Sequence, residues 1–289
     1  MISTLLTRAP GIGPRDLLES HDIPVVSERA GVGQNLWDHL FFDVMHPMTT
    51  PNTNDALATP EGAEAALRQY LDDASGPLSY GGGYIAFEKL PDHIRDTLSD
   101  RTKELLAEYP DDWPEVEYIA SAFPAGPDGG TLGNIAGAIL LPSSRGSVTI
   151  ASASVADKPV IDMRWLTDEA DQEIVVAIVK RCREAWAAEG IQGVLAGQEI
   201  APGANVTADE DILDYVRMSA RAVWHATSTC AMGKEDDENA VVDTKGRVYG
   251  VSSLRVVDAS IFPFCPPGHP QSSVYMLAEK IAADIIGDS

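Results

Sequence analysis

Apolar side chains recur at helical spacing in several stretches of the chain. The clearest stretch covers residues 168–188. Ile174, Ile178 and Cys182 follow one another there at intervals of four, which places them on one face of a helix. Thr167 is placed to cap the start of this helix, and the acidic residues after it suit the positive end of the helix dipole. Similar patterns predict helices at 15–20, 60–73, 91–109, 208–219 and 272–286.

Other stretches have the patterns of strands. Apolar and polar residues alternate at 115–119 and 146–151, as in strands with one covered face. Because helical patterns interrupt these strands, the simplest arrangement is an antiparallel sheet with helical insertions. The remaining strand predictions are 21–26, 84–87, 134–141, 241–242 and 254–257.

Length and composition are those of a folded globular protein. The chain has 289 residues, of which 44% are hydrophobic and 22% charged, so it can bury a core in one large domain or two ordinary ones. No apolar run reaches the roughly 18 to 20 residues of a membrane span. The first residues lack the features of a secretory signal. We therefore expect a cytoplasmic protein, or a secreted one in its processed form.

The formal net charge of -23 argues against two kinds of partner. Nucleic acids and anionic membranes favour proteins rich in Lys and Arg, so neither is expected here. The three cysteines, Cys182, Cys230 and Cys265, are too few and too scattered for a disulfide framework or a zinc site. Reduced, buried thiols and no bound metal are the expectation.

A glycine-containing loop near the start offers polar side chains. Gly31-Val-Gly-Gln-Asn-Leu-Trp-Asp-His39 has two glycines that permit close backbone approach. Asn35, Asp38 and His39 provide its polar groups. The loop is not a dinucleotide fingerprint, because no G-x-G-x-x-G opens a helix after a buried strand in this sequence.

Two histidines in the last third carry the strongest chemical signal. His225 lies in Trp224-His-Ala-Thr-Ser-Thr-Cys-Ala-Met-Gly233, and His269 lies in Pro267-Gly-His-Pro-Gln271. A lone histidine after a tryptophan is more often a core or surface residue than a catalytic one. The prolines restrict the backbone around His269, which suits a fixed side chain but also any rigid loop.

The ordered motifs resemble the C-terminal portion of a glucose-methanol-choline (GMC) oxidoreductase. The resemblance is carried by the loop 31–39, by Leu141-Pro-Ser-Ser-Arg-Gly-Ser-Val148, by the two histidine motifs and by Leu254-Arg-Val-Val-Asp-Ala-Ser260. It implies an α+β fold, with a GMC-like substrate domain of antiparallel sheet and helices plus the C-terminal part of an FAD-binding domain. The corresponding segments are a partial FAD-binding segment at 1–44, a substrate-binding domain at 45–220, and a return to the FAD-binding domain at 221–289. The family's N-terminal dinucleotide motif is not matched in this sequence.

The same resemblance implies a flavin site. In the family, the positions of His225 and His269 form a pair beside the FAD, with His225 the expected base and His269 its partner. Trp224 and Phe264 are expected to wall a substrate pocket, although Trp224 fits a core position equally well. Together with Phe262 they hint at aromatic or apolar alcohols. The residues expected near the cofactor are Asn35, Leu36, Asp38, Asp258, Ala259, Gln271, Ser272 and Val274.

Simpler interpretations remain for several of these residues. Asp258 is also explained as the end of a strand, and Ser272 as a helix cap. The remaining histidines, at positions 21, 39, 46 and 93, are expected to be structural or surface residues. Tight FAD binding by this chain alone is not expected, because the pyrophosphate would lack its glycine-rich turn.

Three functions are therefore open. The first is FAD-dependent oxidation of a primary or aromatic alcohol, in which this chain forms one half of the enzyme. The second is flavin-independent acid/base chemistry, such as cyclisation or dehydration of a small natural product. The third is a non-catalytic remnant. The expected partners are a small alcohol and either a second chain that supplies the missing half or another copy of this chain.

Overall fold

The computed structural model describes residues 6–8, 11–50, 57, 59–79, 83–124 and 130–287, with the side chains of 123 and 124 left aside. The chain forms two compact units. The first comprises residues 1–40, 140–171 and 222–289, and the second comprises 41–139 and 172–221. Residues 140–171 belong to the first unit, whereas the substrate-binding domain was expected to run without interruption from 45 to 220. The fold is α+β.

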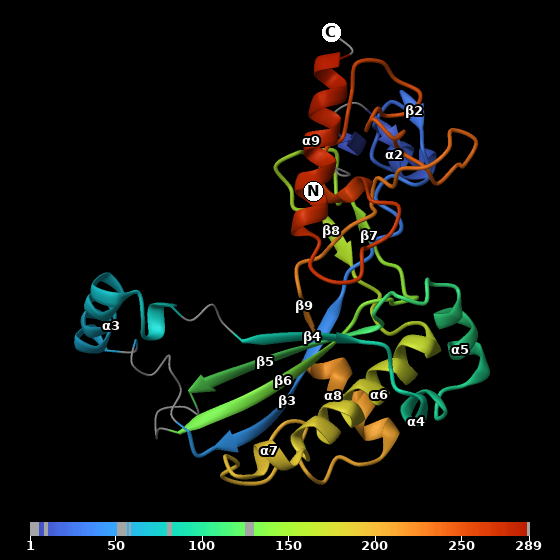
Figure 1. Ribbon diagram of the computed structural model, residues 1–289. Helices are drawn as coiled ribbons and strands as arrows, with labels where there is room; N and C mark the ends of the chain where they lie inside the picture. The colour runs from blue at the N-terminus through green and yellow to red at the C-terminus, as the bar shows by residue number, and fades with distance from the viewer. Residues whose placement is uncertain are drawn as a thin grey trace. The chain divides into compact units, whose positions relative to one another are not determined.

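The second unit is built on a five-stranded sheet of order β4-β5-β6-β3-β9 (Figure 1). Its central hairpin joins β5 to β6 in antiparallel register, with Val116 opposite Ile139. Strand β4 pairs antiparallel with the other edge of β5. The strands are β3 (Leu40–Met48), β4 (Tyr84–Glu88), β5 (Val116–Pro124), β6 (Thr131–Ile139) and β9 (Arg221–Ala222). The predicted antiparallel sheet with helical insertions is confirmed.

Helices α6 (Glu169–Trp186) and α8 (Asp209–Ser219) lie along one side of this sheet (Figure 1). The Trp186 indole donates to the Val44 carbonyl at 2.9 Å, so the end of α6 is fixed to β3. At Gly137 a Cβ atom would lie only 2.2 Å from a methyl carbon of Ile178. The absence of a side chain there lets α6 approach the sheet closely.

Buried or half-buried ion pairs hold the shorter helices of the second unit. Glu115 has a buried side chain that accepts from the Leu90 amide and pairs with Arg95. Arg95 ends α4 (Asp92–Arg95), and α5 (Asp100–Ala107) follows with Ser99 as its cap. The other helices of this unit are α3 (Pro60–Asp73), the 3-10 turn η2 (Pro77–Ser79) and α7 (Glu189–Gln192).

The first unit has shorter elements and much irregular backbone. Strand β1 (Ile12–Gly13) pairs parallel with β2 (Ser27–Glu28), and β7 (Ser147–Thr149) pairs antiparallel with β8 (Val160–Asp162). Its helices are α2 (Arg15–Ser20), η3 (Ala259–Ile261) and α9 (Gln271–Gly287). A core cluster gathers side chains from distant segments: Ile12, Val32, Val241, Val242, Val248, Val256, Ile261 and Ile281.

Sequence-based errors occur in both units. In the second unit, strand β3 was not predicted, and the single helix expected at 91–109 is divided into α4 and α5. The other errors lie in the first unit. The segment 21–26 is turn and extended backbone, and the strand begins only at Ser27. The strands expected at 241–242 and 254–257 are isolated bridges, such as the one between Val242 and Val248. These stretches are apolar because they fill the core as single residues, so apolarity alone could not distinguish them from strands.

The start of α6 is a further correction. The Asp168 carboxylate, rather than Thr167, accepts from the Ala170 amide at 2.9 Å, and the Thr167 hydroxyl donates to the Arg164 carbonyl. The helix therefore begins one residue later than expected. None of the helices in the described residues is long and apolar enough to cross a membrane.

Candidate functional site

Two segments that are far apart in sequence pair to build the site. The Trp37 and Thr227 backbones exchange hydrogen bonds of 3.2 and 2.8 Å in an antiparallel bridge, and the Gly33 amide bonds to the Thr229 carbonyl. Because the pairing is antiparallel, residue 39 lies opposite residue 225. This register places His39, at the end of the glycine-containing loop, next to His225, the predicted base.

Three imidazoles consequently lie together in the first unit. The His39 and His225 rings are perpendicular, with centroids 5.2 Å apart, and their Nδ1 atoms are 3.0 Å apart. The His225 and His269 rings are tilted by 58°, with centroids 4.9 Å apart. His39 is fully buried, His225 is 9% exposed and His269 is exposed. The cluster thus runs from the core to the surface, and the two predicted catalytic histidines are neighbours.

Burial keeps the inner two rings neutral. Loss of solvent, with the nearby His269, lowers the pKa of His225 to about 4. Burial together with His225 lowers the pKa of His39 to about 3. A neutral imidazole has one unprotonated nitrogen, which is the group required of a general base.

Asp38 holds the backbone of this cluster. Its buried carboxylate accepts the His225 amide at 2.9 Å. Burial raises the pKa of Asp38 to about 6, while the amides of His225 and His39 act in the opposite direction. Asp38 thus contacts the histidine segment, and its expected position near the cofactor stays a prediction.

Unusual backbone conformations flank the histidines. Trp224 has a φ of 64° and Gly268 a φ of 115°. The first is uncommon for a residue with a side chain, and such positions cluster at functional sites. The second requires glycine, so Gly268 directs the chain into His269 in a way that other residues would resist.

The predicted pocket aromatics have different environments. Trp224 is 91% exposed, so the alternative that it is a core residue is wrong. Phe264 is about two-fifths exposed, at 39%, whereas Phe262 is buried in the interior. Trp224 and Phe264 are thus available for contact with another molecule, and Phe262 is not.

Three of the expected cofactor residues share one hollow. Leu36, Asp258 and Ala259 line a cavity of about 220 Å³, together with Thr229 and the neighbour of His225, Ala226. The Asp258 carboxylate accepts from the Ser260 amide and caps η3. It therefore starts a 3-10 turn, which corrects the alternative that it ends a strand.

The other expected cofactor residues lie elsewhere in the first unit. Asn35 lines a separate hollow of about 550 Å³, next to Arg145. Gln271, Ser272 and Val274 open α9, and the first helical hydrogen bond runs from the Val274 amide to the Pro270 carbonyl. The preceding amides point out of the helix start. Ser272 is the second residue of the helix, so it does not occupy the cap position.

Among the histidines set aside in the sequence, only His39 joins the cluster. His93 pairs with Glu184 on the surface at 2.8 Å, and His46 packs on Trp186. His39 was missed because its contact with His225 depends on the pairing of two irregular segments. No group of three or more metal-binding side chains occurs in the described part of the chain.

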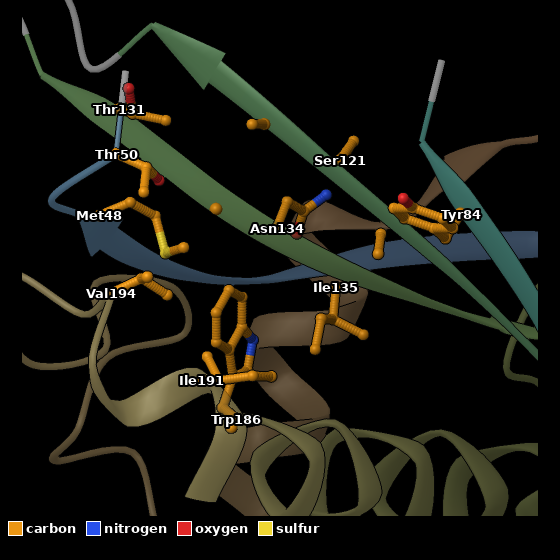
Figure 2. A pocket seen from close by; sticks show the side chains of 14 residues that line it. Met48, Thr50, Tyr84, Ser121, Thr131, Asn134, Ile135, Trp186, Ile191 and Val194 are labelled. Atoms are coloured by element: carbon orange, nitrogen blue, oxygen red, sulfur yellow. The ribbon is translucent and has the colours of Figure 1, made fainter. Parts of the chain in front are cut away.

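The second unit contains its own hollow of about 500 Å³ at the end of the sheet (Figure 2). Figure 2 shows Met48, Trp186 and Ile135 on its apolar side, with Tyr84 and Asn134 among the polar contributors. This hollow has no histidine in its lining. It is therefore a poor candidate for proton transfer.

Comparison with known proteins agrees with the motifs. A family model described as GMC oxidoreductase matches residues 142–278, which include His225 and His269. Dehydrogenase pkfF of Emericella nidulans is 48% identical over 291 residues, across 97% of this chain and 47% of its own length. Residues 142–278 of the chain belong to the GMC oxidoreductase family. The chain corresponds to the C-terminal portion of that family.

Two further relatives show the range of this GMC family. Patulin synthase of Penicillium expansum is 43% identical over 301 residues, covering 99% of this chain and 47% of the relative. An FAD-dependent oxidoreductase from Chaetomium thermophilum has the same fold, with a TM-score of 0.80 and 27% identity over 96% of this chain and 52% of that structure. The GMC chain described here thus spans about half the length of the relatives it matches.

Proposed function

We propose that this chain forms the histidine-bearing half of an FAD-dependent GMC enzyme that oxidises a primary or aromatic alcohol. The observation that carries the proposal is the adjacency of His225 and His269, with ring centroids 4.9 Å apart. His225 is nearly buried and its pKa is lowered to about 4, so it is neutral at physiological pH. The likeness to an FAD-dependent oxidoreductase supports the choice of cofactor.

The residues present fit one part of an FAD molecule. The hollow beside Leu36, Asp258 and Ala259 measures about 220 Å³, below the roughly 300 Å³ at which ligand pockets begin. The exposed start of α9 offers amides that suit a carbonyl or anionic group. These features support contact with one part of a bound flavin, and further polypeptide would have to complete the rest of its site. The sequence offers no glycine-rich fingerprint for the pyrophosphate.

The chain's own residues would accept the hydroxyl proton of the alcohol and orient the hydroxyl group. When bound, the flavin supplies the acceptor for the hydride that leaves the alcohol carbon. The alcohol O–H bond breaks, and its proton forms an N–H bond on His225. His269, exposed and next to His225, would orient the hydroxyl and share the developing charge. Trp224 and Phe264 offer exposed aromatic surface for an apolar or aromatic substrate.

Further polypeptide is required for the complete enzyme in this proposal. Helix α9 carries Tyr275, Met276, Ile285 and Ile286 with exposed fractions between 45% and 76%. Such apolar surface is a liability unless another surface covers it. We propose that the covering surface is the rest of the flavin-binding domain, supplied by a longer chain or by a second chain. Another copy of this chain is the remaining possibility. Nucleic acids and membranes are not proposed as partners of this acidic protein.

One alternative function has its own support. A relative that is 43% identical is named a synthase, not an oxidase or dehydrogenase. A cluster of three imidazoles suits acid/base catalysis without a flavin, such as cyclisation or dehydration of a small natural product. This function would leave the protein colourless while its activity still depended on His225.

The visible spectrum of the purified protein with added FAD separates these functions. The protein is compared as this 289-residue chain and as the chain joined to the N-terminal half of dehydrogenase pkfF. We expect flavin absorption that persists through gel filtration only in the joined form, together with alcohol-dependent loss of that absorption. Turnover of a substrate by colourless protein would favour the acid/base alternative. The absence of both would favour the non-catalytic remnant.

A further inference from the structure

His39 has an environment that a purely space-filling histidine would not need. It is fully buried, yet its Nδ1 atom lies 3.0 Å from Nδ1 of His225. The antiparallel pairing of Trp37 with Thr227 sets the two residues opposite each other. Residues in that position have adjacent side chains on the same face.

A contact between two Nδ1 atoms constrains both protons. One nitrogen must carry a hydrogen and donate, while the other must offer a lone pair. Burial lowers the pKa of His39 to about 3 and that of His225 to about 4, so both rings are neutral. Each neutral ring has one N–H, which leaves two arrangements. Either His225 donates from Nδ1 to His39, or His39 donates to His225.

The positions of the rings favour the first arrangement. His39 lies at the buried end of the cluster and His269 at its exposed end, with His225 in contact with both. If His225 donates from Nδ1 to His39, its Nε2 atom keeps a lone pair for a molecule at the exposed end. The Nδ1 atom of His39 is then the acceptor, and its own proton is on Nε2, which has no hydrogen-bond partner among the described residues.

We propose that His39 is a positioning residue that fixes the tautomer of His225, by accepting its Nδ1–H and leaving Nε2 unprotonated. The two ring nitrogens are separated by one carbon and their in-plane bonding directions diverge, so Nε2 of His225 points away from His39. The use of this lone pair rests on the proposed function, in which it takes the hydroxyl proton of the alcohol. The imidazolium formed in that step still donates its Nδ1–H to His39.

Asp38 fixes the same arrangement through the backbone. Its carboxylate holds the His225 amide at 2.9 Å and also interacts with the His39 amide. The two histidines are thus held both at their side chains and at their backbones. Such orientation of a base by a second group is a general feature of catalytic sites.

The tautomer is directly measurable by NMR on the chain with ¹⁵N-labelled histidine. Protonated and unprotonated ring nitrogens have different ¹⁵N shifts, and His225→Gln identifies the signals of His225. We expect a protonated Nδ1 and an unprotonated Nε2 on His225 at pH 7. The reverse assignment in the wild-type chain would overturn the proposal without any variant at His39. Neither flavin nor substrate is needed, so the result is independent of the proposed function.

Two variants sharpen the test. His39→Phe keeps a ring but removes the acceptor, and we expect His225 to show a mixture of both tautomers. His39→Asn places an amide oxygen near the position of Nδ1, and we expect it to restore the wild-type pattern. His46→Phe is the matched control, because His46 is a half-buried histidine packed on Trp186 in the other unit. An unchanged His225 pattern in His39→Phe would contradict the proposal.

Kinetics give a second measurement in the joined enzyme. We expect His39→Phe to lower kcat for alcohol oxidation about tenfold with KM unchanged, since general-base catalysis as a whole is worth about 10² to 10⁴. His39→Asn should recover most of this loss. A rise in KM with unchanged kcat in His39→Phe would show that His39 only shapes the pocket, and would contradict a tautomer role.

Discussion

The two units of the chain differ in how their important residues are held. In the second unit, regular strands and helices carry the packing, and its ion pairs join neighbouring elements, as Arg181 of α6 joins Glu88 of β4 at 2.7 Å. In the first unit, His39 and His225 lie on irregular segments that pair through an isolated bridge. Regular structure thus forms the scaffold, and the reactive groups sit where the backbone departs from it.

This difference separates stability from chemistry. In the second unit, the buried Glu115 carboxylate is paired with Arg95. In the first unit, His39, His225 and Asp38 are buried, and the loss of solvent around their charged forms shifts their pKa values. Perturbed groups of this kind gather at functional sites. Changes in the two units should therefore have different consequences.

The largest effects should come from the histidines and should fall on activity. In the joined enzyme, we expect His225→Ala to lower kcat/KM for the preferred alcohol about 10³-fold through loss of the base. His269→Ala should lower it about 10²-fold through loss of orientation. In the double variant, kcat/KM should fall by less than the product of the two single decreases, because both side chains act on one hydroxyl group. Independent, multiplicative losses would place the two histidines at separate steps.

An ion pair of the second unit should affect stability alone. Arg95→Met leaves the buried Glu115 carboxylate without its cation, and we expect the free energy of unfolding in urea to fall by about 3 kcal/mol. The His225 ¹⁵N pattern should not change. Arg217→Met is the control, because its partner Asp214 is largely exposed, and it should cost less than about 1 kcal/mol. A changed His225 pattern in Arg95→Met would contradict the separation of the two units.

The buried histidines should make stability depend on pH. His39 and His225 have folded pKa values of about 3 and 4, below the ordinary 6.5, so the unfolded chain binds more protons and stability falls as pH drops below 6.5. From pH 7 to pH 5, each histidine costs about 2 kcal/mol. Asp38 has the opposite effect because its pKa is raised to about 6. It binds a proton more readily in the folded chain, which stabilises the fold by about 1 kcal/mol over the same pH range.

The net loss between pH 7 and pH 5 is then about 2 to 3 kcal/mol in urea unfolding. In His39→Phe the loss should shrink by about 2 kcal/mol, since one titrating group is removed. Equal pH dependence in wild type and His39→Phe would mean that His39 has the same pKa in the folded and the unfolded chain, and would contradict the lowered pKa of the buried ring.

The smallest effect concerns a helix cap in the second unit. The Ser99 side chain accepts the Thr102 amide at the start of α5 and also contacts the buried Thr102 hydroxyl. We expect Ser99→Ala to cost about 1 kcal/mol of unfolding free energy. Activity of the joined enzyme should be unaffected. A stability equal to wild type would show that other contacts already fix this helix start.

The same contrast explains what the sequence could predict. Helices such as α3 and α8 follow from apolar periodicity and turn residues, and their observed bounds agree closely with the expected 60–73 and 208–219. The adjacency of His225 and His269 followed from the family motifs. His39 could not be placed, because no local pattern shows that residues 31–39 pair with 223–229. Trp224 was ambiguous for a related reason, since its positive φ turns the side chain outward.

The most direct test of the central claim is anaerobic mixing of the joined, flavin-loaded enzyme with an aromatic alcohol in a stopped-flow spectrometer. We predict that the absorption of the oxidised flavin disappears in wild type, and that His225→Ala slows this step about 10³-fold. A rate in His225→Ala equal to that of wild type would contradict the account, because another group would then be taking the proton from the alcohol.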